Sequence, residues 1–355
     1  MTRQVFCGNV PIGGGAPVSI QSMTNTDTRD AAATLVQISR LADAGCQIVR
    51  CAVPDMEAAK SIAAIKKGSP IPVVADIHFD YKLAIAALDS GADKVRINPG
   101  NIGGEENFAK VLSKAKECDA AVRIGVNSGS LEKKLLAKYG GICAEALCES
   151  ALKSVKFAES EGFESIVVSL KSSDVKVNHE AHRLFAAQSD RPLHIGLTEA
   201  GAGRMAEIKS CAALGALLLE GIGDTMRISL TGDPVREVKL AAELLQAVGL
   251  RRRGIDFISC PSCGRTRVDL DGIAREVENR LEPLSEKLAN DGIFIKVAVM
   301  GCEVNGPGEA KDADFGVACG KGCGLLFKRG ETLRTVPEDR IVTELIDLIE
   351  KEFYL

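Results

Sequence analysis

The chain has 355 residues, a formal net charge of −4, 4% aromatic residues and no tryptophan. The acidic balance excludes bulk attraction to nucleic acid, and the composition is more typical of an α/β enzyme than of an all-β binding module. No apolar run reaches the roughly 18 residues of a membrane span. The N-terminal segment lacks the apolar stretch of a signal peptide, so we expect a cytoplasmic protein.

The first 250 residues repeat one unit, in which a β-branched run ends in polar residues and a helical pattern follows. In the first such helix, Leu35, Ile38 and Leu41 share one face and Gly45 ends the pattern. Eight strands alternating with helices over about 250 residues predict a (β/α)8 TIM barrel. An open doubly wound sheet is the competing interpretation, but no G-x-G-x-x-G follows the first strand. The eight runs are Val18–Thr26, Gln47–Pro54, Ile71–Phe79, Lys94–Asn101, Ala121–Ser130, Ser165–Asp174, Leu193–Gly201 and Thr225–Asp233.

A change of pattern after residue 250 predicts a second, smaller α+β domain over residues 251–355. It begins with the basic stretch Arg251–Arg253. A long helix is expected at about Ile273–Asn290, a strand at Phe294–Met300 and a final helix at about Pro337–Phe353.

Cations gather at the predicted ends of the barrel strands, where barrel enzymes carry their catalytic groups. One arginine there usually forms a salt bridge, but five converging cations in an acidic protein require an anion. Guanidinium groups match phosphate oxygens bidentately, so we predict a phosphate ester with several charges as ligand. The five cations are Arg50, Arg96, Arg123, Lys171 and Arg227, and Asn98, Asn127 and Ser229 could donate hydrogen bonds to the same ligand.

Four further polar residues are predicted near the same strand ends. Asp76 and His78 resemble a divalent-metal pair, but no third ligand is evident, so we place both among the substrate-binding residues. His78 and His194 either face the barrel mouth or are core histidines. Glu199 is the carboxylate expected at the end of the seventh strand, where it could relay a proton.

The cysteines of the second domain suggest a metal centre. Cys260 and Cys263 form a C-x-x-C turn, and Cys302 begins a glycine-rich loop that ends at Glu309. Three thiolates and one harder, labile carboxylate describe an iron–sulfur cluster with an open corner, where a substrate oxygen could bind.

A structural zinc site is the alternative interpretation of the same motif, because a C-x-x-C turn also occurs in zinc knuckles. Cys319 and Cys323 could then supply the fourth ligand. The glycine-rich loop around Cys302 favours the cluster, since it can turn tightly around a bulky object. Cys319 and Cys323 are then expected in a terminal loop without a role.

The remaining cysteines and two histidines are expected to be structural. His179 and His182 are predicted to lie on an exposed helix face. The cysteines are interpreted as small buried hydrophobic residues: Cys7, Cys46, Cys51, Cys118, Cys143, Cys148 and Cys211.

Six segments together resemble one enzyme family, the GcpE-type 4-hydroxy-3-methylbut-2-enyl diphosphate synthases of the methylerythritol phosphate route to isoprenoids. The resemblance covers nearly the whole chain and fits the short bacterial form. The segments are Gln21–Thr26, Val74–Asp80, Arg96–Gly103, Ser169–Asp174, Leu197–Gly201 and Val299–Glu309.

The resemblance implies a TIM barrel joined to an iron–sulfur domain, in a head-to-tail homodimer. It implies reductive ring opening and dehydration of 2-C-methyl-D-erythritol 2,4-cyclodiphosphate, with two electrons passing from flavodoxin or ferredoxin through a 4Fe-4S cluster. Glu309 would be the exchangeable cluster ligand, and Glu199 or His194 the proton donor. The cluster ligands would be Cys260, Cys263, Cys302 and Glu309, and the diphosphate ligands Arg50, Arg96, Arg123, Asn127, Lys171, Arg227 and Ser229.

Two other functions remain open at this point. The first is a barrel lyase or transferase that acts on a phosphorylated substrate and carries a structural zinc domain. The second is a cluster-bearing electron carrier or sensor without a substrate, which leaves the five strand-end cations unexplained.

Overall fold

The computed structural model describes residues 1–302, 310 and 312–353. Glu309, the predicted fourth cluster ligand, therefore lies outside the described residues. The chain divides into two compact units, Met1–Leu250 and Arg251–Leu355. Within the described residues, no helix is both long and apolar enough to cross a membrane.

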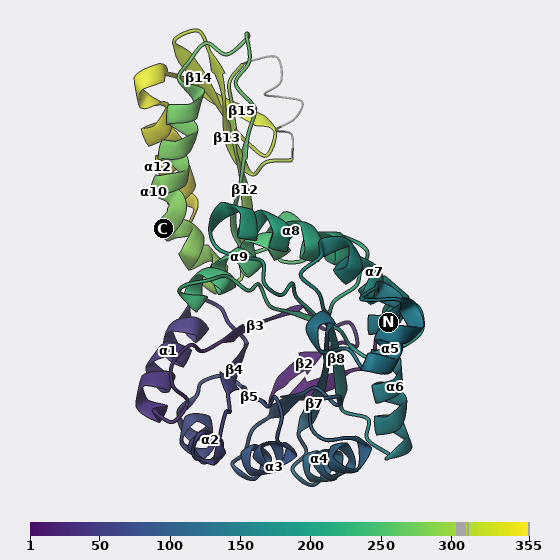
Figure 1. The fold of residues 1–355 in the computed structure, drawn as a ribbon. Helices are drawn as coiled ribbons and strands as arrows, with labels where there is room; N and C mark the ends of the chain where they lie inside the picture. Colours follow the sequence, from purple (N-terminus) through teal and green to yellow (C-terminus); the bar gives the residue numbers. More distant parts are fainter. Residues whose placement is uncertain (303–309, 311, 354–355) are drawn as a thin grey trace. The chain divides into compact units, whose positions relative to one another are not determined.

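The first unit is a barrel of eight parallel strands, as predicted (Figure 1). From β3 to β8 each strand pairs with the next along the chain, β9 pairs with β10, and β10 pairs back with β3. Between β8 and β9 a single bridge from Val168 to Leu193 closes the ring. Each predicted β-branched run contains one strand. The strands are β3 (Ser19–Met23), β4 (Ile48–Ala52), β5 (Val73–Asp76), β6 (Lys94–Ile97), β7 (Ala121–Asn127), β8 (Ile166–Lys171), β9 (His194–Ile195) and β10 (Thr225–Met226).

Helices follow the strands and cover the outside of the barrel (Figure 1). Several begin at an aspartate whose carboxylate accepts a backbone N–H of the first turn, as Asp30 does from Ala33 and Asp55 from Ala58. Their apolar faces bury residues such as Ile38 and Ile62 against the sheet. The helices are α1 (Ala31–Asp43), α2 (Met56–Gly68), α3 (Tyr81–Asp89), α4 (Glu105–Glu117), α5 (Lys133–Tyr139), α6 (Ala144–Ser160), α7 (Val175–Ala186), α8 (Gly203–Leu219) and α9 (Pro234–Ala247).

An N-terminal hairpin of β1 (Val5–Cys7) and β2 (Val10–Ile12), which the sequence did not predict, fills one end of the barrel. Its apolar side chains pack against residues at the beginnings of the barrel strands, among them Ile48, Val74 and Val167. This end is therefore closed by apolar packing. One buried cation also lies here: Lys94, the first residue of β6, interacts with Cys7 of the hairpin.

The second unit is a five-stranded mixed sheet with helices on one face, which confirms the predicted smaller α+β domain. Strands β11, β12 and β13 run parallel, and β13, β14 and β15 pair antiparallel. Helices α10 and α12 lie side by side (Figure 1) and bury Leu281 and Leu345 with Val317 of the sheet. The elements are β11 (Gly254–Ser259), α10 (Leu270–Asn290), β12 (Phe294–Met300), β13 (Phe315–Gly320), β14 (Cys323–Lys328), β15 (Glu331–Pro337) and α12 (Ile341–Phe353).

The prediction of a terminal loop around Cys319 and Cys323 is wrong. Cys319 lies in β13 and is fully buried, and Cys323 begins β14. The two strands form a hairpin in which Gly320 pairs with Cys323. The turn between them is short and glycine-rich, so the sequence there resembles a loop although both flanks are strands.

Two further predictions about burial are wrong. His182 is fully buried on α7, where its Nδ1 lies 2.7 Å from the carbonyl oxygen of Asn178. His179 is partly exposed and pairs with Glu220 at 2.9 Å. Cys118 is exposed, because it follows directly after the end of α4. Periodicity alone did not separate the inner from the outer face at these positions.

Candidate functional site

A cavity of about 240 Å³ lies where the barrel strands end. Its wall contains all five predicted cations, with the predicted Asp76, His78, Asn127 and Ser229. The sequence analysis missed three of the lining residues, Met23, Ser169 and Thr198. The complete lining is Met23, Arg50, Asp76, His78, Arg96, Arg123, Asn127, Ser169, Lys171, Thr198, Arg227 and Ser229.

The strand register brings these side chains together. Successive side chains of a strand point to opposite faces, so every second residue enters the barrel. In β6 and β7, Arg96 lies beside Arg123 in register, and in β7 and β8, Asn127 lies beside Lys171. The same alternation carries Met23 of β3 next to Arg50 of β4. Met23 could therefore have been found from this signal.

Asp76 is the carboxylate in the cavity wall. It is 3% exposed, and its oxygens lie 3.4 Å from Nη1 of Arg96, 3.8 Å from Nε of Arg50 and 3.2 Å from Nε2 of His78. Burial by itself raises the pKa of Asp76, but Arg50, His78 and Arg96 outweigh burial and hold that pKa well below its usual range. Asp76 is therefore ionised and offsets part of the positive charge.

Two of the other cations, Arg123 and Lys171, have no carboxylate partner among the described residues. Arg123 is fully buried, and no described residue accepts a hydrogen bond from any of its three guanidinium nitrogens. Burial, followed by the neighbouring Arg50, lowers the pKa of Arg123 and that of Lys171 well below their ordinary values. Buried donors without acceptors are costly. Their grouping indicates a site that receives an anion.

Arg50 and Arg227 both contact the thioether of Met23. The Met23 sulfur accepts hydrogen bonds from Nη2 and Nε of Arg50 at 2.9 and 3.2 Å, and from Nη1 of Arg227 at 3.6 Å. Burial lowers the pKa of Arg50 to about 10, although Asp76 opposes this shift. Arg50 thus remains charged near neutral pH, held by a weak acceptor that a phosphate oxygen could replace.

Glu237 is a site residue that the search of strand ends could not find, because it lies in the first turn of α9. It is 3% exposed and pairs with Arg227 at 3.1 Å. In the sequence, Glu237 comes three residues after Pro234 and looks like an ordinary acidic residue in the first turn of a helix. Its spacing from Ala241 and Leu244 places it on the apolar face of the helix, and this signal could have found it.

Three predicted residues do not line the cavity. Asn98 instead organises the loop after β6, donating to Oγ of Ser130 at 2.7 Å and accepting from the backbone of Gly100 at 3.1 Å. His194 is fully buried, and within the described residues neither ring nitrogen has a hydrogen-bond partner. Burial, then Arg123 and Lys171, lower the pKa of His194 well below its usual value, so its imidazole is neutral.

Glu199 is exposed in the loop after β9, and its backbone has a φ of +55°. A non-glycine residue in this region is strained, and such strain gathers at functional sites. This conformation sets Glu199 apart from the other exposed carboxylates near the strand ends.

In the second unit, the predicted cysteine ligands follow the ends of two adjacent parallel strands. Cys260 follows β11 and Cys302 follows β12, with Ser259 beside Val299 in register. The backbone N–H of Gly301 donates to the sulfur of Cys260 at 3.1 Å.

Cys263 is exposed on the turn that follows Cys260. Hydrogen bonds from the backbone and side chain of Arg265 lower the pKa of the Cys263 thiol, which favours the thiolate that metals bind. Among the described residues, no three histidine, cysteine or acidic side chains are close enough to hold a metal ion.

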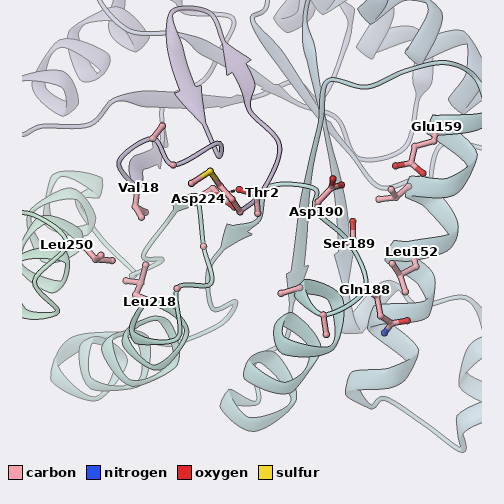
Figure 2. A pocket seen from close by; sticks show the side chains of 18 of the residues that line it. Thr2, Val18, Leu152, Glu159, Gln188, Ser189, Asp190, Leu218, Asp224 and Leu250 are labelled. Atoms are coloured by element: carbon pink, nitrogen blue, oxygen red, sulfur yellow. Dashed lines mark hydrogen bonds between the residues drawn. The ribbon is translucent and has the colours of Figure 1, made fainter.

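A larger cavity, of about 720 Å³, lies beside the beginnings of the barrel strands (Figure 2). Its wall carries three carboxylates, Glu159, Asp190 and Asp224, against one lysine, Lys156. Oγ of Thr2 donates to Asp224 at 2.6 Å and ties the N-terminus to this wall. The negative balance does not suit a phosphate ester, so the smaller cavity is the better candidate despite its size.

Comparison with known proteins gives matches to both units. Residues 2–242 match the family described as GcpE TIM-barrel domain, and residues 256–351 match the GcpE protein C-terminal domain. The chain is 56% identical to the 4-hydroxy-3-methylbut-2-en-1-yl diphosphate synthase (flavodoxin) of Geobacter sulfurreducens, over 99% of this chain and 97% of that protein. A protein of the same name from Clostridium acetobutylicum is 54% identical, over 98% of each chain.

Among solved structures, the barrel resembles dihydropteroate synthases. That of Stenotrophomonas maltophilia has a TM-score of 0.51 at 14% identity, covering 69% of this chain and 96% of that one. That of Yersinia pestis has a TM-score of 0.50 at 12% identity, with the same coverage. At such low identity the likeness shows the barrel fold alone.

Proposed function

Because the chain belongs to the GcpE family, we propose that the cationic cavity of its barrel is the substrate site of a 4-hydroxy-3-methylbut-2-enyl diphosphate synthase. The reaction is the reductive ring opening and dehydration of 2-C-methyl-D-erythritol 2,4-cyclodiphosphate. It consumes two electrons and releases water.

The group of cations around Arg123 is the observation that carries this proposal. Arg50, Arg96, Lys171 and Arg227 surround it, and Asp76 is the carboxylate that shares their cavity. A cyclic diphosphate supplies two phosphate groups that can accept hydrogen bonds from these buried donors. As the ring C–O bond to phosphate breaks, charge grows on the phosphate oxygens, and donors already in place stabilise it.

We assign the proton delivered to the departing hydroxyl group to Glu199. Its carboxyl group can relay a proton, and its strained backbone lies in the loop after β9. Burial among cations depresses the pKa of His194, so its imidazole is neutral and does not hold the extra proton that a donor needs. His194 could relay a proton only after receiving one.

The described cysteines fit the proposed 4Fe-4S cluster in their chemistry. Cys260 and Cys302 follow adjacent strand ends, and hydrogen bonds from Arg265 lower the pKa of the Cys263 thiol, which suits thiolate ligation of iron. Glu309 would be the fourth, exchangeable ligand. When bound, the cluster supplies the substrate with electrons one at a time.

Ligand substitutions test the cluster and the zinc alternative together. Cys260→Ser, Cys263→Ser and Cys302→Ser are each expected to lose iron and the broad visible absorption of anaerobically purified protein. Cys323→Ser, which alters a half-buried thiol at the start of β14, is the matched control and should keep both. Colourless wild-type protein loaded with zinc would refute the cluster, and loss of iron in Cys323→Ser would refute the ligand assignment.

The partners follow from the same proposal. The relatives named above are flavodoxin-dependent, so we propose flavodoxin as electron donor, with ferredoxin as the alternative. Turnover with each reduced carrier distinguishes them. We also propose a cytoplasmic head-to-tail homodimer, whose assembly state light scattering can measure.

A further inference from the structure

Glu237 makes more contacts than a simple ion pair requires. One of its oxygens, Oε2, accepts from Nε of Arg227 and from Oγ of Ser22, each at 3.1 Å. The other, Oε1, accepts from Nη2 of Arg227 at 3.1 Å and from the backbone N–H of Leu230 at 3.0 Å. One buried carboxylate therefore links the ends of β3 and β10.

These contacts fix the direction of the Arg227 guanidinium. Glu237 occupies the edge formed by Nε and Nη2, in the bidentate arrangement that orients a planar guanidinium. The remaining terminal nitrogen, Nη1, lies on the side of Met23, in the wall of the cavity. The contact with Leu230 also holds the residue directly after Ser229, another lining residue.

A salt bridge that only stabilises the barrel is the simpler interpretation. Strands β9 and β10 have only two residues each, so their ladder is short and extra contacts there would stabilise the barrel. That interpretation explains the contact with Ser22. It does not explain why the carboxylate holds one edge of Arg227 and leaves the other nitrogen beside the cavity.

We infer that Glu237 is a positioning residue, which prepares Arg227 for a phosphate group before the substrate arrives. This inference rests on the proposed function, because it needs a phosphate site in the cavity. Among the described residues, Arg123 has no such partner, whereas Arg227 is already held in one orientation. Binding energy is then not spent on ordering Arg227.

A double-mutant cycle tests the inference in the full-length protein, with inorganic diphosphate as the probe and calorimetry as the measurement. Glu237→Gln is expected to weaken diphosphate binding about tenfold, because it removes a charged acceptor. In an Arg227→Met background, the same substitution should change binding less than about twofold. Glu243→Gln, on the exposed face of the same helix, is the matched control and should bind as the unchanged protein does.

The melting temperatures of the same variants provide a second test. Glu237→Gln should lower the melting temperature when Arg227 is present and raise it in the Arg227→Met background, where the buried carboxylate has lost its charged partner. If Glu237→Gln does not fold, Glu237→Asp keeps the charge but withdraws the carboxylate by one methylene. Glu237→Asp should also weaken binding.

The outcomes separate this inference from the proposed function. Wild-type protein that fails to bind diphosphate would remove the phosphate site and the inference with it. Diphosphate binding in the wild type with an equal loss in both backgrounds would show that Glu237 does not act through Arg227. A fall in melting temperature with unchanged binding in the folded Glu237 variants would make the pair a structural salt bridge.

Discussion

At the scale of single residues, two buried arginines of the barrel differ in their partners. Arg191 is 1% exposed, and its guanidinium contacts Glu159 and Glu164 together with the carbonyl oxygen of Glu164. Arg123 is equally buried and has no acceptor among the described residues. The first arrangement stabilises the fold, whereas the second retains unused donors for a ligand.

Replacing each arginine by methionine should therefore have opposite effects. Arg191→Met is expected to lower the free energy of unfolding by about 1.5–3 kcal/mol, the usual loss for hydrogen bonds to charged groups, because its partners Glu159 and Glu164 are themselves partly exposed to solvent. Arg123→Met should not lower it, because a desolvated and unpaired cation is removed. Diphosphate binding should weaken by about 1.5–3 kcal/mol in Arg123→Met only.

Urea unfolding and titration calorimetry on both variants check this contrast. A large loss of stability in Arg123→Met, with normal affinity in the folded fraction, would show that Arg123 is structural. Normal stability in Arg191→Met would contradict the role of its ion pairs.

At the scale of elements, the loop after β9 and the loop after α4 each hold one non-glycine residue in a strained backbone conformation. Glu199 and Asp119 have φ values of +55° and +50°. Glycine adopts this conformation without the steric cost of a side chain. Glu199→Gly and Asp119→Gly should each raise the free energy of unfolding by about 1 kcal/mol.

Activity should distinguish the two loops. The Glu199→Gly enzyme is expected to lose most of its turnover, because a proton donor is removed, while the Asp119→Gly enzyme should turn over normally. Steady-state assays with reduced flavodoxin measure this. A fully active Glu199→Gly enzyme would assign the strain of this loop to packing and the proton donor to another group.

At the scale of the whole molecule, buried histidines set how stability depends on pH. Burial lowers the pKa of His182 to about 4, and burial and nearby cations lower the pKa of His194 as well. In the unfolded chain these histidines have a pKa of about 6.5, so between this pH and their lower folded pKa the unfolded state binds more protons than the folded state. Stability is therefore fully present above about pH 6.5 and is lost as the pH falls toward 4.

His182 alone should contribute roughly 3 kcal/mol to this loss, from about 1.4 kcal/mol for each unit of pKa shift. His182→Gln should make the curve of unfolding free energy against pH clearly flatter between pH 6.5 and 4. Asp76, whose pKa is also depressed, acts in the same sense, but its contribution is lost only in more acidic solution, below the ordinary carboxyl pKa. Calorimetric melting across this pH range is the measurement, and an equally steep curve for His182→Gln would contradict the assignment.

The sequence by itself determined the barrel, the smaller second domain and the strand-end cations. These features follow from two local signals in the sequence. Hydrophobic periodicity indicates strand or helix, and alternation along a strand indicates which side chains enter the barrel. The carboxyl ends of parallel strands then necessarily meet at one mouth. For this reason Arg50, Arg96 and Arg123 can be grouped from the sequence alone.

Only the tertiary structure decided how these residues are supported. Ser22 and Glu237 are 215 positions apart, and they meet because β3 and β10 close the ring. The burial of His182 also depends on packing between elements, which the sequence pattern of a single helix does not specify. Closure of the barrel and packing between its elements decide which residues meet. Of five similar cations, Arg227 is the one that Glu237 holds in a fixed orientation.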